Sequence, residues 1–346
     1  MSNTEIDPSE YQAEHVTCAE AIDIITAREV PLGGPRAMRV RRTLPQRKRS
    51  LIGPWCFVDH FGPDDVATSG GMSVPRHPHT GLATVTLLFE GRIEHVDSTD
   101  FANVVRPAEV NLMIAGTGVS HSEFSSSDTT TLHGIQLWYA LPDATRYSAP
   151  GSQHHVAERA DVPGGEIMTY IGTCADITSP VRTRVDALAA QVDVRAGEAV
   201  EIPVDTDFEH GVLVDSGDLT LVVDGHRQPV APTELAHLPE GGPGTIRLEA
   251  GDEPVRAILI GGRPFGEKLV MWWNFVGRSH DEIVAHRQAW QTEIGAEEFP
   301  IALSAADSGR YADGTEYPQF GTFPTDQPDP LPAPPLPNAR ITPREQ

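Results

Sequence analysis

The chain has 346 residues, which is enough for two domains of ordinary size. Its 49 acidic and 26 basic residues give a formal net charge of −23, and this argues against direct binding to nucleic acid or to anionic membranes. The three cysteines are far apart and show no CxxC spacing, so neither a disulfide framework nor a zinc finger is indicated.

The same composition predicts a cytoplasmic protein. An odd number of scattered cysteines fits a reducing compartment. The start of the chain has no basic segment followed by an apolar one, and no later stretch approaches the roughly 18 apolar residues of a membrane span. We therefore expect no targeting signal and no membrane segment.

The first elements in chain order are a tail and an edge strand. Residues 1–15 are polar and acidic and predict a mobile tail. Met38 to Leu44 alternates as an edge strand does. The basic residues at 39, 41, 42, 47, 48 and 49 are interpreted as a solvated strand face with its loop rather than as an anion site. His60, in the apolar block that follows, is expected to have a structural or supporting role.

Two histidines stand at the centre of the first half of the chain. His77 and His79 are separated by Pro78 and precede a run with strand character, Leu82 to Phe89. Side chains at i and i+2 of an extended segment point the same way, so both rings could converge on one ion. A pair of this kind alone is more often a pair of ordinary surface or hydrogen-bonded histidines than half of a metal site.

A second pair with the same spacing favours a metal site. His121 and Glu123 follow the turn Gly116-Thr117-Gly118. Three imidazoles and one carboxylate suit a divalent transition metal such as iron, nickel, copper or manganese, and they argue against a calcium or magnesium site. His95 and His133 fall within predicted strands, where they could face the cavity or be ordinary core or surface histidines.

The second half repeats the pattern of strands without the paired ligands. Strands are predicted between residues 183 and 262, and the histidines there, His210, His226 and His237, show no HxH or HxE spacing. Ser279 followed by Glu282 is a capping-box signature and predicts a helix over about 279–294. The proline-rich residues after Glu316 predict an extended tail that is ordered only if it lies on a surface.

Together these motifs resemble the pirin family of the cupin superfamily. The resemblance is carried by six blocks in one order: GPWCFVDHFGP (53–63), RHPHTG (76–81), EHVDS (94–98), IAGTGVSHSE (114–123), LHGIQLWYALP (132–142) and the segment from Pro254 to Ile283. Leu82-Ala83-Thr84 stands where the general cupin pattern has a glutamate, so Glu123 is the only carboxylate ligand candidate.

The resemblance implies an all-β fold of two tandem cupin barrels, each a double-stranded β-helix or jelly roll, with few short helices. We expect a tail at 1–15, a metal-binding domain at 16–148, a second cupin domain without metal at 149–300, and a proline-rich tail at 301–346. The matching ligand positions for one metal, with iron as first choice and nickel, copper or manganese as alternatives, are His77, His79, His121 and Glu123.

The function that the resemblance implies is that of a quercetin 2,3-dioxygenase, acting on a small planar aromatic substrate with dioxygen. Glu123 could then alternate between ligand and general base. Phe57, Phe61, Leu88 and Trp138 are candidates for the cavity wall. Two alternatives stay open: a metal-containing regulatory protein with a protein partner, and a cupin isomerase or hydrolase that uses the metal as a Lewis acid.

Overall fold

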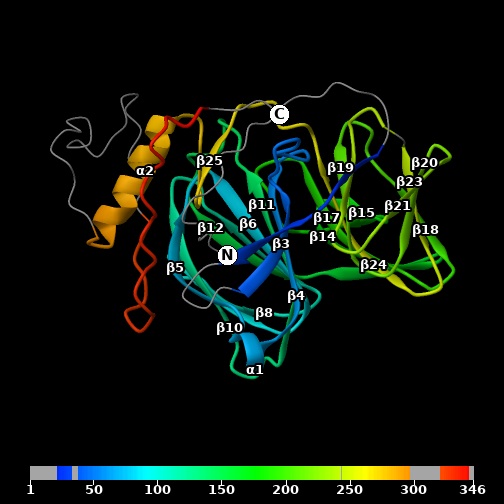
Figure 1. The fold of residues 1–346 in the computed structure, drawn as a ribbon, viewed down its shortest axis with the longest axis horizontal. Helices are drawn as coiled ribbons and strands as arrows, with labels where there is room; N and C mark the ends of the chain where they lie inside the picture. The colour runs from blue at the N-terminus through cyan, green and yellow to red at the C-terminus, as the bar shows by residue number, and fades with distance from the viewer. Residues whose placement is uncertain (1–21, 33–37, 243, 297–319, 343–346) are drawn as a thin grey trace.

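A computed structural model describes residues 22–32, 38–242, 244–296 and 320–342 of the chain (Figure 1). The sequence-predicted tails at 1–15 and at the start of 301–346 lie outside these residues. The regular secondary structure of the described part is mostly β-strand, arranged as two barrels that lie side by side. The prediction of an all-β fold of two cupin barrels is confirmed.

The first barrel consists of a large and a small antiparallel sheet. The large sheet has the order β12-β9-β6-β11-β4-β3-β2 and the small one the order β5-β10-β7-β8. Its strands are β2 (Arg28–Leu32), β3 (Met38–Leu44), β4 (Trp55–Asp65), β5 (Ser73–His79), β6 (Leu82–Glu90), β7 (Ile93–Asp97), β8 (Ala102–Val105), β9 (Glu109–Ile114), β10 (Val119–Ser125), β11 (Thr131–Ala140) and β12 (Gly151–Val156).

The second barrel repeats this plan, and one strand from the start of the chain completes it. Its large sheet has the order β1-β22-β19-β24-β17-β14-β13 and its small sheet the order β18-β23-β20-β21. The strands are β1 (Asp23–Ile25), β13 (Glu158–Val162), β14 (Gly165–Ile171), β17 (Ala187–Val194), β18 (Ala199–Pro203), β19 (Glu209–Ser216), β20 (Leu219–Val223), β21 (His226–Val230), β22 (Leu235–Leu238), β23 (Thr245–Ala250) and β24 (Val255–Gly262). β1 precedes the first barrel in the chain but pairs with β22 of the second barrel. The domain limits drawn from the sequence stay predictions.

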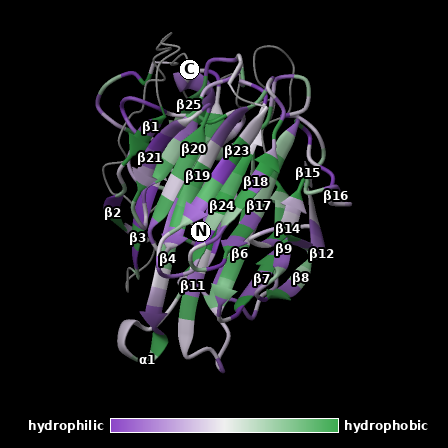
Figure 2. Ribbon diagram, turned by 90° about the vertical axis from the view of Figure 1, so that its right-hand side faces the viewer, coloured by the Kyte–Doolittle hydropathy of each residue, from purple (hydrophilic) through white to green (hydrophobic). Residues whose placement is uncertain are grey.

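The hydrophobic core between the barrels holds the two large sheets together. Their strands carry long hydrophobic stretches, green in Figure 2. Leu137 and Tyr139 of β11 pack in one buried cluster with Tyr170 of β14 and Ile258 and Ile260 of β24. Alternate residues of the same strands face the inside of each barrel, as the two-residue period of a strand requires. The central strands of each large sheet are therefore buried on both faces.

Most of the remaining described elements pack near the first barrel, and they include the predicted helix. Ser279 caps α2 (His280–Glu293), its hydroxyl accepting a hydrogen bond from the Glu282 amide, so the helix prediction is confirmed. A hairpin of β25 (Val270–Trp272) and β26 (Phe275–Gly277) packs with α2. Residues 320–342 contain no helix or strand and run along α2 and β5 (red in Figure 1). Short elements complete the set: α1 (Val66–Ser69), β15 (Thr173–Cys174) and β16 (Ile177–Thr178).

The interpretation of the basic cluster as a solvated face is wrong for one residue. Arg42 is 1% exposed and donates two hydrogen bonds, of 2.7 and 2.8 Å, to the Asp59 carboxylate inside the first barrel. Its guanidinium also lies over the Phe57 ring. Arg39, by contrast, is exposed and pairs with Glu29. A buried cation is tolerated where a carboxylate satisfies its donors, and periodicity alone could not show that Asp59 faces Arg42.

Candidate metal centre

Neighbouring strands of the small sheet bring the two predicted ligand pairs together. β5 and β10 run antiparallel, with His77 opposite His121 and His79 opposite Val119. The ring nitrogens of His77, His79 and His121 lie within 4.8 Å of one another, and all three side chains are fully buried. The i, i+2 spacing of His77 and His79 therefore has the consequence expected from an extended strand: both rings enter the barrel on one face.

Glu123 lies two residues from His121 on β10 and is buried in the same barrel. Its carboxylate belongs to a second group of close ligand atoms, with His95 and His121. The Thr86 hydroxyl lies 3.2 Å from Glu123 Oε1 and 2.9 Å from Gln136 Oε1. His121 is thus shared by two groups of close ligand atoms, one with His77 and His79 and one with Glu123. Their role in binding a metal stays a prediction.

The protonation states of the histidines fit a metal. Burial lowers the pKa of His77, of His79 and of His121 well below the ordinary value, and the neighbouring rings lower it further for His79 and His121. All three are therefore neutral at pH 7 and offer lone pairs.

His77 Nδ1 donates to the Pro75 carbonyl at 2.9 Å, which leaves the buried Nε2 without a hydrogen-bond partner. His79 Nε2 and His121 Nε2 are 3.0 Å apart. Soft-to-borderline nitrogen donors with one carboxylate are a donor set that suits a divalent transition metal.

Aromatic residues form part of the wall around these ligands. Phe57 and Trp138 stack with ring centroids 4.0 Å apart, and Trp138 meets His79 edge-on at 5.0 Å. Phe61 and Leu88 pack instead into a hydrophobic cluster with Val30 and other core residues. Two N–H donors of β11, the amide Nε2 of Gln136 and the indole Nε1 of Trp138, are buried without a hydrogen-bond partner.

The hairpin β25–β26 and helix α2 pack against the end of β5 that carries His79. The Val276 amide donates to the Thr80 carbonyl at 3.1 Å, and Thr80 Oγ1 lies 3.0 Å from His286 Nδ1 of α2. Gly81 adopts a positive φ of 67°, and a Cβ there would lie 2.2 Å from the Val276 carbonyl oxygen. The approach of the hairpin thus requires glycine at this position.

A third group of potential ligands lies between the two barrels. Nε2 atoms of His60 and His133 lie 2.7 and 2.6 Å from Asp215 Oδ1, which comes from β19 of the second barrel. Arg256 holds the other oxygen of Asp215 at 2.7 Å. The buried His60 Nδ1 has no partner. A metal ion bound through His60 Nε2 would place the ring hydrogen on the buried Nδ1, where it has no acceptor. The metal ion would also lie beside the positively charged Arg256. This cluster is better explained as a polar clasp between barrels, in line with the structural role expected for His60.

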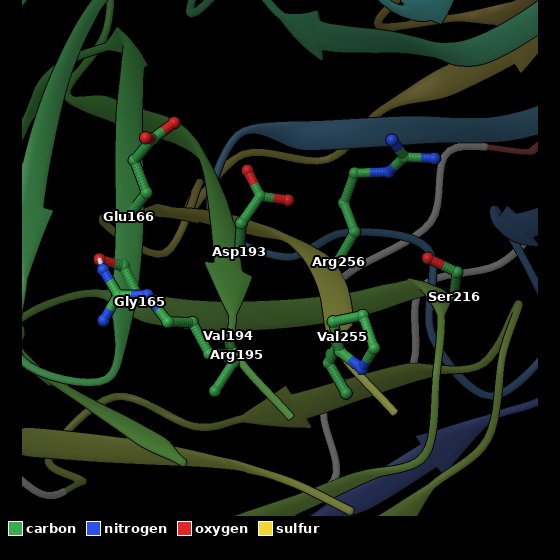
Figure 3. Close-up of a pocket in the computed structure, with 9 residues that line it drawn as sticks. Gly165, Glu166, Asp193, Val194, Arg195, Ser216, Val255 and Arg256 are labelled. Atoms are coloured by element: carbon green, nitrogen blue, oxygen red, sulfur yellow. Dashed lines mark hydrogen bonds between the residues drawn. The ribbon is translucent and has the colours of Figure 1, made fainter. Parts of the chain in front are cut away.

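An open pocket of the second barrel is lined by none of the predicted ligands. It has a volume of about 450 Å³. Glu166, Asp193 and Arg256, paired in register across β14, β17 and β24, project to the same side of the sheet (Figure 3). Burial raises the pKa of Asp193. Neither the HxH pair nor the HxE pair of the sequence indicated this pocket.

Comparisons with known proteins match both barrels. The family model described as Pirin matches residues 37–139, and the one described as the Pirin C-terminal cupin domain matches residues 189–294. A Pseudomonas aeruginosa protein named provisionally as a quercetin 2,3-dioxygenase is 39% identical over 77% of this chain and 82% of its own length. A rat protein named pirin is 30% identical over 71% of this chain and 83% of its own length.

Solved structures agree with these matches. A crystal structure described as quercetin 2,3-dioxygenase from Acinetobacter baumannii has 31% sequence identity and a TM-score of 0.78, covering 92% of this chain and 96% of that one. A structure described as a bacterial pirin from Escherichia coli in complex with nickel(II) shares the fold, with 18% identity and a TM-score of 0.53. Among the described residues, no helix is long and apolar enough to cross a membrane.

Proposed function

This chain belongs to the pirin family, and on that premise we propose that it is a metal-dependent dioxygenase that cleaves flavonols such as quercetin. The proposed centre is mononuclear, with His77, His79, His121 and Glu123 as its ligands. The observation that carries the proposal is the convergence of three buried, neutral imidazoles, one with an unpartnered Nε2, beside a buried carboxylate. The names of two relatives that are more than 30% identical support the choice of reaction.

The metal, when bound, supplies Lewis acidity and a site at which dioxygen chemistry can occur. The residues of the chain then have separate tasks. Glu123 is the proposed base for the substrate hydroxyl, and the Thr86 hydroxyl beside Oε1 fixes the orientation of its carboxylate. The Trp138 ring, backed by the stacked Phe57 ring, is the proposed flat apolar wall for a planar aromatic ligand.

The proposal is tested by metal analysis of protein purified without chelating resin, followed by oxygen uptake on a small flavonol panel. Samples of the apoprotein are loaded separately with iron, nickel, copper and manganese. We expect flavonol-dependent oxygen uptake with at least one metal, and release of carbon monoxide. If none of the four loaded forms consumes oxygen, the enzymatic proposal fails.

A regulatory role is the second candidate, because the predicted ligands are enclosed. His77, His79 and His121 are each 0% exposed, and the hairpin β25–β26 packs at the end of β5. A relative named pirin is 30% identical to this chain. In this alternative the metal state controls the surface presented to a protein partner. Metal-dependent binding to such a partner without oxygen uptake would favour it.

A further inference from the structure

A fourth buried histidine in the first barrel, His95 of β7, touches the proposed centre without matching either ligand pair. It is 1% exposed. Its Nδ1 lies 3.4 Å from His121 Nδ1, and its Nε2 lies 3.1 Å from Asp97 Oδ2. Both ring nitrogens of His95 therefore already face a hydrogen-bond partner. This arrangement leaves His95 with no free lone pair for a metal, although its ring is close to Glu123 and His121.

Asp97 is built to remain a carboxylate. Oδ1 accepts from the Thr99 amide at 2.8 Å and from the Thr99 hydroxyl at 2.6 Å, and the Ser152 hydroxyl donates to Oδ2. The side chain is fully buried, and each of these partners can donate a hydrogen bond to it. Asp97 Oδ2 therefore accepts a hydrogen bond from His95 Nε2, so His95 carries its hydrogen on Nε2.

The tautomer of His121 follows from that of His95. With its hydrogen on Nε2, His95 presents a lone pair at Nδ1, which can only accept from His121 Nδ1–H. His121 then has its own lone pair on Nε2, the atom that faces His79 Nε2 at 3.0 Å. His77 reaches the same state by another route, since its Nδ1 donates to the Pro75 carbonyl.

We infer that His95 and Asp97 are positioning residues that fix His121 as a metal ligand through the chain Asp97, His95, His121. The inference rests on the ligand set of the proposed function and deepens it. A carboxylate behind a ligand imidazole holds its ring orientation and increases its basicity, and loss of such a partner typically weakens metal affinity 10- to 100-fold. Here the carboxylate acts through one intervening imidazole.

The first experiment reads the tautomers directly. Zinc(II) is used as a diamagnetic probe, and long-range ¹H–¹⁵N NMR spectra of the ¹⁵N-labelled full chain are recorded with one equivalent of zinc(II). We expect His95 with its hydrogen on Nε2, and His121 with its hydrogen on Nδ1. A spectrum with the His95 hydrogen on Nδ1 would overturn the inference, and this result needs no variant.

The second experiment measures zinc(II) affinity by competition with a chromophoric chelator. His95→Phe removes the relay while filling its volume, and we expect the dissociation constant to rise about 10- to 100-fold. His95→Gln keeps an acceptor oxygen that can face His121 Nδ1–H, so it should recover part of the affinity. Asp97→Leu removes the carboxylate and should weaken binding as His95→Phe does.

The matched control is Glu94→Gln, which removes a carboxylate from the exposed face of the same strand and should leave the affinity unchanged. Unchanged affinity in both His95→Phe and Asp97→Leu would refute the inference. These measurements do not involve oxygen uptake. A chain that binds zinc(II) through the relay but consumes no oxygen would therefore refute the dioxygenase proposal alone.

Discussion

At the scale of single residues, the proposed centre depends on neutral imidazoles that arrive from two strands. His77 and His79 share one face of β5, and His121 lies opposite His77 on β10. Burial keeps all three neutral, so protons compete little with a metal at pH 7. This predicts a site that is ready for a metal before the metal binds.

The first prediction is one metal per chain. Elemental analysis of the wild-type protein should give close to one equivalent, because only the first barrel holds the proposed ligand set. The double variant His77→Ala, His121→Ala should lose it, since two of four ligands are removed. His226→Ala, which changes an exposed histidine of β21, is the control and should retain the metal. Close to two equivalents in the wild type, or undiminished metal in the double variant, would contradict this prediction.

The second prediction separates two tasks of Glu123. Glu123→Gln keeps the shape and one ligand oxygen but removes basicity, so the metal should largely stay. Turnover of the flavonol should fall by a factor of roughly 100 or more, the usual contribution of a positioned general base. A role as ligand alone would instead lower metal occupancy and activity in proportion. Parallel metal analysis and oxygen uptake, with Glu94→Gln as control, distinguish the two outcomes.

At the scale of elements, strand β11 connects the site to the domain interface. Gln136 and Trp138 face the inside of the first barrel, while Leu137 and Tyr139 face the second barrel. β11 is paired along its length with β4 and with β6. A change in its backbone position should therefore disturb the site and the interface together.

The third prediction concerns Gly134 in this strand. A Cβ at Gly134 would lie 2.5 Å from the Leu87 carbonyl oxygen and 2.9 Å from the Phe61 ring. Gly134→Ala should lower the free energy of unfolding by roughly 2 kcal/mol, as overpacking in a core does. Gly151→Ala in β12 is the matched control, since a Cβ there meets nothing within 4 Å. Denaturant titrations of both variants test this, and equal midpoints would contradict it.

At the scale of the whole molecule, two barrels are joined by an apolar core and by the clasp of His60, His133 and Asp215. Burial alone would raise the pKa of Asp215, but hydrogen bonds from His133 and His60 hold it far below its ordinary value. An ionised Asp215 therefore stabilises the folded state at pH 7. Because its folded pKa is depressed, this contribution is present above the unfolded pKa of about 3.9 and is lost progressively as the pH falls from there through the folded pKa.

The fourth prediction follows from this clasp. Asp215→Asn should destabilise the protein by roughly 3 kcal/mol at pH 7, because it leaves part of a buried charge network unpaired. The difference from wild type should shrink as the pH is lowered below about 4, where the wild-type contribution is itself lost. Asp186→Asn removes an exposed partner of Arg263 and should leave stability essentially unchanged. A pH-independent difference for Asp215→Asn would contradict the linkage.

The fifth prediction concerns reducing agents. Cys56 and Cys174 are buried and free, and burial raises the pKa of both thiols, to about 11 for Cys174. Neither thiol is therefore reactive at pH 7. The melting temperature should be the same with and without dithiothreitol, after correction for loss of metal to the reagent. A fall of many degrees would contradict the expectation of a cytoplasmic protein.

Much of the proposed site could be predicted because its geometry is local. HxH and HxE pairs place two side chains on one face of any extended strand, whatever the rest of the chain does. The cap of α2 is equally local, since Ser279 and Glu282 lie within one helical turn. The two-barrel fold was predicted from the order of the six motif blocks, which resembles that of a known family.

Only the tertiary structure decided which other polar residues meet. Asp97 lies two residues from His95, but the contact of His95 with His121 depends on the register of β7 against β10. Asp215 reaches His60 across 155 residues, and Arg42 meets Asp59 because β3 pairs with β4. Strand periodicity gives the face on which a side chain lies, whereas sheet register and the packing of two barrels give its partner.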